Sequence, residues 1–292
     1  MFNGSMTALI TPFRDGEIDA EALHKLIEFQ LANGTSAVVP CGSTGESATL
    51  THQEHIDVLR LVIKFVKGRV PVIAGTGSNS TAEATALTRA AKEAGATAAL
   101  LISPYYNKPT QEGIYQHYKT VAEAARLPVI VYNIPGRTAS KIEAATVARL
   151  AQLDNIVGLK EATGSLDEVQ EVIRLCGDRF ELYSGDDSLT LPILAAGGVG
   201  VISVIANIMP RETAEMVATS LRGDLTTARR LHYRLLPLIR ALTLETNPSP
   251  IKAALSMLGY CRDELRLPLL PMSNAPRAKL RAALVDLGLL PS

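Results

Sequence analysis

The chain has 292 residues, 47% of them hydrophobic, so it can form one large or two ordinary domains with a substantial buried core. Lysine plus arginine and aspartate plus glutamate balance at 29 each. This balance disfavours nucleic acid, an anionic membrane surface or a strongly charged protein as a partner, and it favours a small ligand.

The cysteines predict a reducing compartment. Cys41, Cys176 and Cys261 are odd in number, widely spaced and outside any CxxC pair, which is typical of free thiols rather than of disulfides or a zinc site. The first residues lack the basic flank and apolar core of a signal peptide, and no apolar stretch reaches the roughly 18 residues of a membrane span. We therefore expect a cytoplasmic protein that has no membrane partner.

Short apolar runs, rich in β-branched residues, recur about every thirty residues and predict eight strands. Several runs are apolar on both faces, as expected for a parallel sheet covered by helices. The eight runs are residues 6–10, 37–39, 70–74, 98–102, 129–132, 156–159, 180–183 and 200–204.

The segments between these runs have helical periodicity. Residues 20–32, for example, place Leu23, Leu26, Ile27 and Leu31 on one face. Capping boxes, in which Ser or Thr is followed three residues later by Glu, mark four of the helix starts. The four pairs are Thr51 and Glu54, Ser80 and Glu83, Ser140 and Glu143, and Ser165 and Glu168.

Eight strand–helix units within residues 1–222 predict an α/β protein with a (β/α)8 TIM barrel, because a doubly wound open sheet more often stops at five or six strands. Residues 223–292 are predicted to be helical only, with helices over 227–244, 249–258 and 275–287 separated by Asn-Pro, Gly-Tyr and proline-rich breaks. We expect a catalytic barrel followed by a helical region.

Lys160 directly follows the apolar run 156–159, so it is predicted to lie at the carboxyl end of a strand, where barrel enzymes place their active sites. Burial lowers the pKa of an ammonium group, and a neutral amine can attack a carbonyl group to form a Schiff base. On position alone, a pair with Glu161 or an outward-pointing Lys160 remains an equal alternative.

Polar residues follow other strands in the same way. The turn at residues 42–47 has two glycines and adjacent hydroxyls suited to a carboxylate, although a simple capped turn would look the same. Tyr105 and Tyr106 follow the fourth strand; they can relay protons or pack at a subunit contact. Arg137 follows the fifth strand and can clamp a carboxylate or form a surface salt bridge.

Other candidate sites are not expected to bind metals or nucleotides. His52 and His55 are spaced i,i+3, which is not the HExxH pattern, so we expect no metal there. Neither Asp186 nor Asp187 has the partners that a metal site needs, and Asp187 is interpreted as a helix N-cap. The Gly-Thr-Gly sequence at residue 75 lacks the third glycine and the acidic residue of a dinucleotide fingerprint.

Four motifs occur in order at predicted strand ends: GSTGES at 42–47, PYYNKP at 104–109, YNIPGRT at 132–138 and GLKEATG at 158–164. Together they resemble the pyruvate-dependent class I aldolases of the dihydrodipicolinate synthase and N-acetylneuraminate lyase family. The resemblance covers nearly the whole chain, including the helical region, and it resolves the ambiguity of Lys160 in favour of the nucleophile.

The resemblance implies that Lys160 forms an imine with pyruvate without any other cofactor, and that the resulting enamine adds to L-aspartate 4-semialdehyde. The product would be 4-hydroxy-tetrahydrodipicolinate, made in the committed step of the diaminopimelate route to L-lysine. The implied proton relay consists of Tyr132, Ser43 and a Tyr106 from a neighbouring subunit. The implied substrate-binding residues are Thr44 and the Ile202 backbone for pyruvate, Arg137 for the semialdehyde, and Gly185 and Asn247 in the same cavity.

Resemblance also implies a homo-oligomer, usually a tetramer built as a dimer of dimers, and a pocket for the feedback inhibitor L-lysine. The matching pocket residues are Ser47, Ala48, His52, His55, Asn79, Glu83 and Tyr105. The competing interpretation is local structure, since Glu83 also belongs to a capping box. This chain departs from the family at Ser43, where threonine is usual; the hydroxyl remains, but its rotamer is less restricted.

Two alternative functions are also compatible with the sequence. A sialic acid or 2-keto-3-deoxy sugar acid lyase of the same family would share the chemistry of Lys160 and Tyr132, but Arg137 fits a short carboxylated aldehyde better than a polyol chain. A non-catalytic barrel that senses pyruvate or lysine would have no need of a nucleophilic amine.

Overall fold

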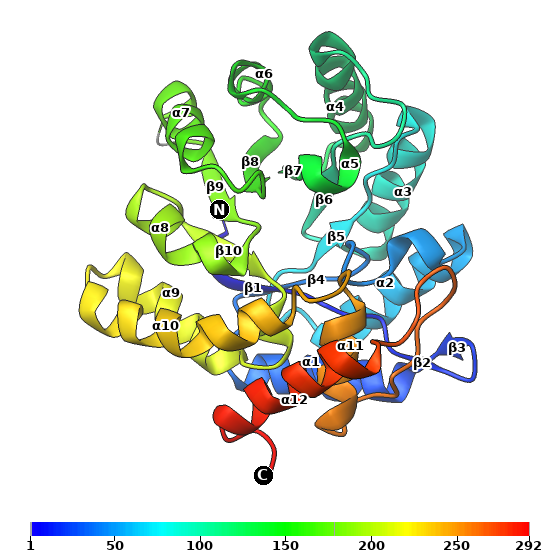
Figure 1. The fold of residues 1–292 in the computed structure, drawn as a ribbon. Helices are drawn as coiled ribbons and strands as arrows, with labels where there is room; N and C mark the ends of the chain where they lie inside the picture. Colours follow the sequence, from blue (N-terminus) through cyan, green and yellow to red (C-terminus); the bar gives the residue numbers. More distant parts are fainter. Residues whose placement is uncertain (1, 178, 292) are drawn as a thin grey trace.

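The structure is a computed structural model that describes residues 2–177 and 179–291. Eight parallel strands surround a central axis, in the order β4-β1-β10-β9-β8-β7-β6-β5 (Figure 1). A single bridge between Val38 and Val72 joins the two edges, so the sheet closes into a barrel. Its strands are β1 (Gly4–Ala8), β4 (Ala37–Val39), β5 (Ile73–Gly75), β6 (Ala98–Ile102), β7 (Val129–Asn133), β8 (Ile156–Glu161), β9 (Glu181–Ser184) and β10 (Gly200–Ser203).

Helices alternate with these strands and surround the barrel (Figure 1). They are α1 (Ala20–Ala32), α2 (His52–Val66), α3 (Thr81–Ala94), α4 (Gln111–Ala125), α5 (Pro135–Thr138), α6 (Ala144–Leu150), α7 (Leu166–Cys176), α8 (Thr190–Ala195) and α9 (Pro210–Leu221). Three short 3-10 helices lie in the loops after strands: η1 (Ser47–Thr49), η2 (Asp187–Leu189) and η3 (Ile205–Asn207). The predicted (β/α)8 barrel is confirmed, with every predicted strand present and most bounds moved by one to three residues.

Some local predictions were wrong or incomplete. A hairpin of β2 (Phe13–Arg14) and β3 (Glu17–Ile18) follows β1 and was not predicted, because its two-residue strands are too short for a periodic pattern. The capping box at Thr51 is complete. Ser140, in contrast, does not cap a helix: its N–H donates to the Thr138 hydroxyl, and α6 begins after Glu143.

The Ser80 and Ser165 hydroxyls cap their helices as predicted, by accepting the backbone N–H of Glu83 and Glu168. In these two caps the glutamate side chains bind elsewhere. The Glu168 carboxylate pairs with Lys141, and the Glu83 carboxylate accepts hydrogen bonds within a cleft described below. Half of each capping box is therefore present.

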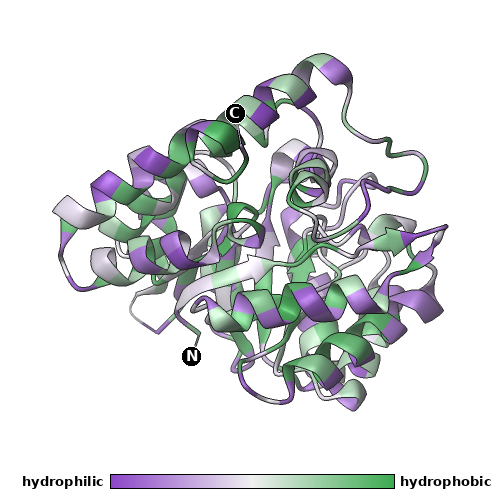
Figure 2. Ribbon diagram, turned by 90° about the horizontal axis from the view of Figure 1, so that it is seen from below, coloured by the Kyte–Doolittle hydropathy of each residue, from purple (hydrophilic) through white to green (hydrophobic). Residues whose placement is uncertain are grey.

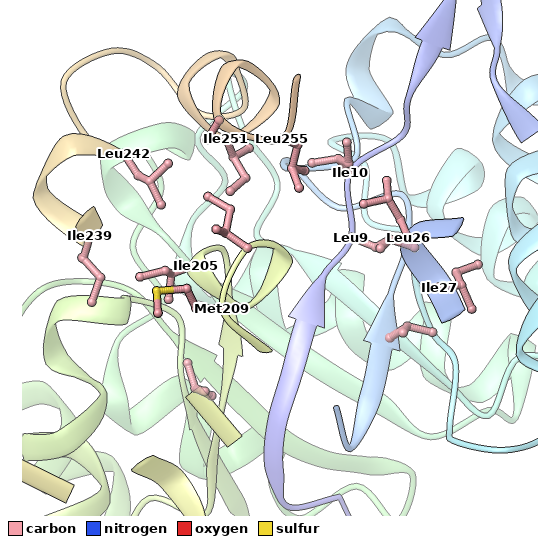
Figure 3. Packing of buried hydrophobic residues seen from close by; sticks show 14 of the residues in the cluster. Leu9, Ile10, Leu26, Ile27, Ile205, Met209, Ile239, Leu242, Ile251 and Leu255 are labelled. Carbon is pink, nitrogen blue, oxygen red and sulfur yellow. The ribbon is translucent and has the colours of Figure 1, made fainter. Parts of the chain in front are cut away.

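The C-terminal region forms the predicted helices α10 (Leu225–Ala241), α11 (Ser249–Met257) and α12 (Asn274–Asp286). Figure 3 shows Ile239, Leu242, Ile251 and Leu255 of this region approaching the apolar residues of the barrel, among them Ile205. These residues belong to one buried cluster that also contains Leu9 and other residues near β1. The C-terminal helices thus share a hydrophobic core with the barrel.

The hydropathy of the helices fits this arrangement. Figure 2 shows the outer helices as alternating hydrophilic and hydrophobic segments, the pattern of amphipathic helices that cover a core. A second buried cluster lies among residues 84–193, and a third, made largely of strand residues such as Met6, Ile130 and Tyr183, fills the barrel. Within the described residues, no helix is long and apolar enough to cross a membrane.

Candidate active site

Lys160 lies near the end of β8 and points into the carboxyl end of the barrel. It pairs in register with Tyr132 of β7, and its Nζ lies 4.2 Å from the centre of the Tyr132 ring. Only 5% of Lys160 is exposed. Burial lowers the pKa of this amine to about 8, an effect that nearby Asp187 opposes and Arg137 reinforces. At pH 7 the amine is still mostly protonated, but about a tenth of it is neutral and nucleophilic, far more than for an ordinary lysine.

Gly185 leaves room for this lysine. Its N–H donates to the Glu161 carbonyl at 2.7 Å, which places the loop after β9 directly against the end of β8. A Cβ at position 185 would lie 3.1 Å from Lys160 Cε and 2.9 Å from the Ala162 Cβ. A larger residue at position 185 would therefore displace the Lys160 side chain.

Tyr132 supplies a protonated phenol beside the amine. The residue is 6% exposed, and burial raises the pKa of its hydroxyl well above the ordinary value, with Arg137 acting in the opposite direction. Because the phenol keeps its proton at neutral pH, it can donate that proton to a developing alkoxide and later recover it.

The turn at residues 42–47 follows β4 and carries the adjacent hydroxyls of Ser43 and Thr44. Its backbone is held by hydrogen bonds from the N–H of Gly45 to the Gly42 carbonyl at 3.0 Å and from the N–H of Glu46 to the Ser43 carbonyl at 3.2 Å. These bonds fix the internal conformation of the turn.

Asn247 connects this turn to Arg137. The Asn247 side-chain amide donates to the Thr44 hydroxyl at 3.0 Å, and the Arg137 guanidinium donates to the Asn247 carbonyl at 2.9 Å. The C-terminal region therefore contributes directly to the site.

These residues enclose a cavity of about 250 Å³ at the carboxyl end of the barrel. Among the described residues that line it, those predicted from the sequence are Ser43, Thr44, Tyr132, Arg137, Lys160, Gly185 and Asn247. The lining does not include Ile202, which is buried in β10, or Tyr106, which is 87% exposed. One subunit thus brings together seven of the nine predicted catalytic and substrate-binding residues.

A larger cleft of about 680 Å³ adjoins this cavity and shares Ser43, Tyr132 and Arg137 with it. Six of the seven residues predicted for a lysine pocket line this cleft: Ser47, Ala48, His52, His55, Glu83 and Tyr105. The seventh, Asn79, lies outside the described lining, and its carbonyl accepts a hydrogen bond from Asn107.

Within the cleft, the Glu83 carboxylate accepts hydrogen bonds from Ser78 and His52, which together lower its pKa. His55 is buried, its Nε2 lies 2.7 Å from the Gly75 carbonyl, and burial lowers its pKa. Glu83 is thus an anion and His55 a neutral ring at neutral pH. The cleft can receive a cationic ligand.

The prediction that Asp187 caps a helix was wrong: Asp186 caps η2, through the N–H of Ser188. The Asp187 Oδ2 instead accepts the N–H groups of Val204 and Ile205, at 2.9 Å each. Its Oδ1 is buried without a hydrogen-bond partner in the described part of the chain. Such a contact between distant loops leaves no local pattern in the sequence.

A buried ion pair between Glu46 and Lys252 was also missed. Lys252 belongs to α11, and the side chains of both residues are fully buried. The signal was available, because Lys252 is the one charged residue in the otherwise apolar and small segment 249–257.

Across residues 2–177 and 179–291, no group of three or more His, Cys, Asp or Glu side chains could hold a metal ion.

Fold and site define a class of protein: a (β/α)8 barrel enzyme in which a buried lysine amine of lowered pKa lies beside a tyrosine hydroxyl. A family model described as the Dihydrodipicolinate synthetase family matches residues 1–287. The chain therefore belongs to the dihydrodipicolinate synthase family of lyases.

Individual relatives agree with this assignment. The chain is 55% identical to a 4-hydroxy-tetrahydrodipicolinate synthase of Geobacter sulfurreducens, over 99% of this chain and all of that one. It is 44% identical, with a TM-score of 0.98, to a crystal structure of the Acinetobacter baumannii dihydrodipicolinate synthase complexed with pyruvate, over 99% and 100% of the two chains. A lysine-bound synthase from Cyanidioschyzon merolae is 42% identical, with a TM-score of 0.96 over 99% of each chain.

Proposed function

We propose that the protein condenses pyruvate with L-aspartate 4-semialdehyde to give 4-hydroxy-tetrahydrodipicolinate, the committed step of the diaminopimelate route to L-lysine. The observation that carries the proposal is the Lys160 amine, which is buried, has a pKa of about 8 and adjoins Tyr132. The relatives named as synthases, and the pyruvate bound in one of them, support the choice of substrates.

In the proposed mechanism the neutral Lys160 amine attacks the pyruvate ketone, and loss of water leaves an imine. The positive imine acidifies the methyl group, which loses a proton to give an enamine. The enamine carbon attacks the aldehyde of the second substrate, whose own amine then displaces Lys160 and closes the ring. The covalent imine on Lys160 is an intermediate, and the reaction needs no cofactor.

Proton transfers in this mechanism are assigned to Tyr132, whose buried phenol remains protonated until it donates its proton to a reaction intermediate. Ser43 and a Tyr106 from a neighbouring subunit would complete the relay. The 87% exposure of Tyr106 supports this part of the proposal, because an aromatic side chain so exposed in one subunit is available to another. Membership of the family is the basis on which we also propose a homotetramer, built as a dimer of dimers.

Substrate carboxylates are assigned to two places. Thr44 and the backbone of Ile202 would hold the carboxylate of pyruvate, and Arg137 that of the semialdehyde. Gly185 and Asn247 would line the remaining wall. The hydrogen bonds that link Thr44, Asn247 and Arg137 support a site in which both carboxylate positions are fixed relative to one another.

The alternative function, that of a sialic acid or 2-keto-3-deoxy sugar acid lyase, is not favoured. The relatives reported above are named as synthases, and a cavity of about 250 Å³ flanked by Arg137 suits a short carboxylated aldehyde better than a long polyol. A non-catalytic binding barrel is disfavoured because burial of an unpaired lysine costs stability that mere binding would not require.

We further propose that L-lysine inhibits the enzyme by binding in the larger cleft. Glu83 supplies an anion there for the ligand's ammonium group, and the lysine-bound relative supports the assignment of the ligand.

The division into a catalytic barrel, residues 1–222, and a helical region, residues 223–292, remains a proposal. So does a cytoplasmic location, supported by three free cysteines.

The proposed function is tested by pyruvate-dependent turnover of L-aspartate 4-semialdehyde, with the product coupled to a reductase that oxidises NADPH. Turnover that disappears in the Lys160→Ala variant is the expected result. Cleavage of N-acetylneuraminate or a 2-keto-3-deoxy sugar acid is measured alongside. Cleavage of either sugar acid without turnover of the semialdehyde would overturn the assignment and favour the lyase.

A further inference from the structure

A charge cluster lies beneath the turn at residues 42–47, outside the cavity. Its centre is the Glu46–Lys252 ion pair, in which both side chains are fully buried. Lys252 Nζ also donates to the Glu264 carbonyl at 2.9 Å and lies 4.1 Å from the centre of the Phe13 ring. The lysine is therefore fixed in three directions by groups from separate parts of the chain.

Glu46 transmits this fixed position to the turn. Its backbone has φ of 53°, a left-handed conformation that a residue other than glycine adopts only where its surroundings require it. Its N–H donates to the Ser43 carbonyl at 3.2 Å. The residue that carries the buried carboxylate is thus hydrogen-bonded directly to the Ser43 backbone.

Two other residues of the C-terminal region form hydrogen bonds with the same turn. Asn247, two residues before α11, donates to the Thr44 hydroxyl at 3.0 Å, and the backbone N–H of Arg266 donates to Glu46 Oε2 at 3.2 Å. Lys252 lies on α11 between these two contacts. The C-terminal region therefore contacts two side chains of the turn, the Thr44 hydroxyl and the Glu46 carboxylate.

Fold stability alone does not account for the pair. Moving two charges out of water is costly, and apolar residues of similar volume commonly replace such a pair without loss of stability. An ion pair does, however, specify one geometry, which apolar contacts between flexible side chains do not.

We infer that Lys252 is a positioning residue which, through Glu46, holds the Ser43–Thr44 hydroxyls in the geometry that binds the carboxylate of the keto acid. The inference rests on the proposed function, because it takes pyruvate as the ligand. It assigns the C-terminal helical region a role in substrate binding as well as in the core.

The test compares two variants. Lys252→Met leaves Glu46 buried without its partner and is expected to lose stability as well as affinity. The double variant Glu46→Met/Lys252→Met removes both charges and is expected to recover most of that stability. Arg277→Met is the matched control, because it breaks the Arg277–Asp263 pair, which lies within the C-terminal region and does not touch the turn.

The measurement is reductive trapping of pyruvate on Lys160 with cyanoborohydride, followed by mass spectrometry as pyruvate is varied. It requires no second substrate. In the double variant, we expect the pyruvate concentration for half-maximal trapping to rise about tenfold or more, since small displacements of positioning groups have effects of this size. Trapping at saturating pyruvate should change much less, and Arg277→Met should trap like the unsubstituted protein.

Each other outcome has a definite meaning. A folded double variant with an unchanged half-maximal concentration would overturn the inference, and so would an equal rise in Arg277→Met. A double variant that does not fold would overturn it too, because the pair would then serve the fold. If the unsubstituted protein traps no pyruvate, the proposed function itself fails.

Discussion

Replacing Lys160 with methionine should stabilise the protein while abolishing its activity. The ordinary pKa of a lysine is 10.5, and burial lowers that of Lys160 to about 8. Because one pKa unit corresponds to about 1.4 kcal/mol, keeping this amine charged in the folded state costs about 3 kcal/mol. Methionine has a similar length and no charge, so the Lys160→Met variant avoids this cost.

The pH dependence of the gain follows from the sign of the change. Below about pH 8 the amine is protonated in both the folded and the unfolded state, so the full cost is present. Between about pH 8 and 10.5 the folded protein has released the proton and the unfolded chain retains it, so the stability of the unsubstituted protein rises with pH in this window. The advantage of Lys160→Met should therefore be largest at pH 7 and decline towards pH 10.5.

The assay is urea unfolding of both proteins at equal concentrations, from pH 6.5 to 10, since oligomers unfold in a concentration-dependent way. Lys252→Met is a matched control with the opposite expected sign, because it leaves Glu46 buried and unpaired; we expect a loss of about 3 to 5 kcal/mol. A Lys160→Met variant that is no more stable at pH 7, or whose gain does not vary with pH, would refute the reasoning.

Three further outcomes are expected. At low pyruvate, the rate of reductive trapping should rise about tenfold per pH unit up to about pH 8 and then level off, as the fraction of neutral Lys160 does; a rise that continues to pH 10 would show an ordinary lysine. Tyr106→Phe should lower kcat about 100-fold. If Tyr106 serves a neighbouring subunit, mixing the Tyr106→Phe variant with the Lys160→Ala variant should restore activity in mixed oligomers. Full activity of a diluted monomer would exclude that role. Glu83→Gln should raise the L-lysine concentration for half-inhibition about tenfold, the effect of losing one charged hydrogen bond, and an unchanged value would place the inhibitor elsewhere.

The barrel strands and the longer helices were predictable because each carries an apolar run or a periodic pattern of its own. Helix α1 begins and ends at the predicted residues, since Asp19 caps it and apolar residues recur at helical spacing before Gly34. Ser140 shows the limit of such patterns. The capping-box spacing is present there, but the Thr138 hydroxyl accepts the Ser140 N–H and Glu143 becomes the N-cap.

The candidate site was predictable where residues lie at or shortly after the carboxyl ends of strands, as Lys160 near the end of β8 and Arg137 in α5 do. Contacts between distant segments were not. The carboxylate of Asp187 binds backbone groups 17 and 18 residues away, and Glu46 pairs with a lysine more than 200 residues later. Neither distance is encoded in a local spacing. Lys252 could have been flagged as an isolated charge among apolar residues, but its partner could not have been named.

The shared core of the barrel and the C-terminal helices has a consequence for how the chain folds during synthesis. The cluster built from residues 84–193 is complete once that middle segment has emerged from the ribosome. The cluster containing Leu9 also needs Leu284, so the segment that directly follows β1 must wait for the last helix before its surroundings are final. We expect the middle of the barrel to become compact first, while apolar residues near the N-terminus stay accessible to chaperones until translation is nearly finished.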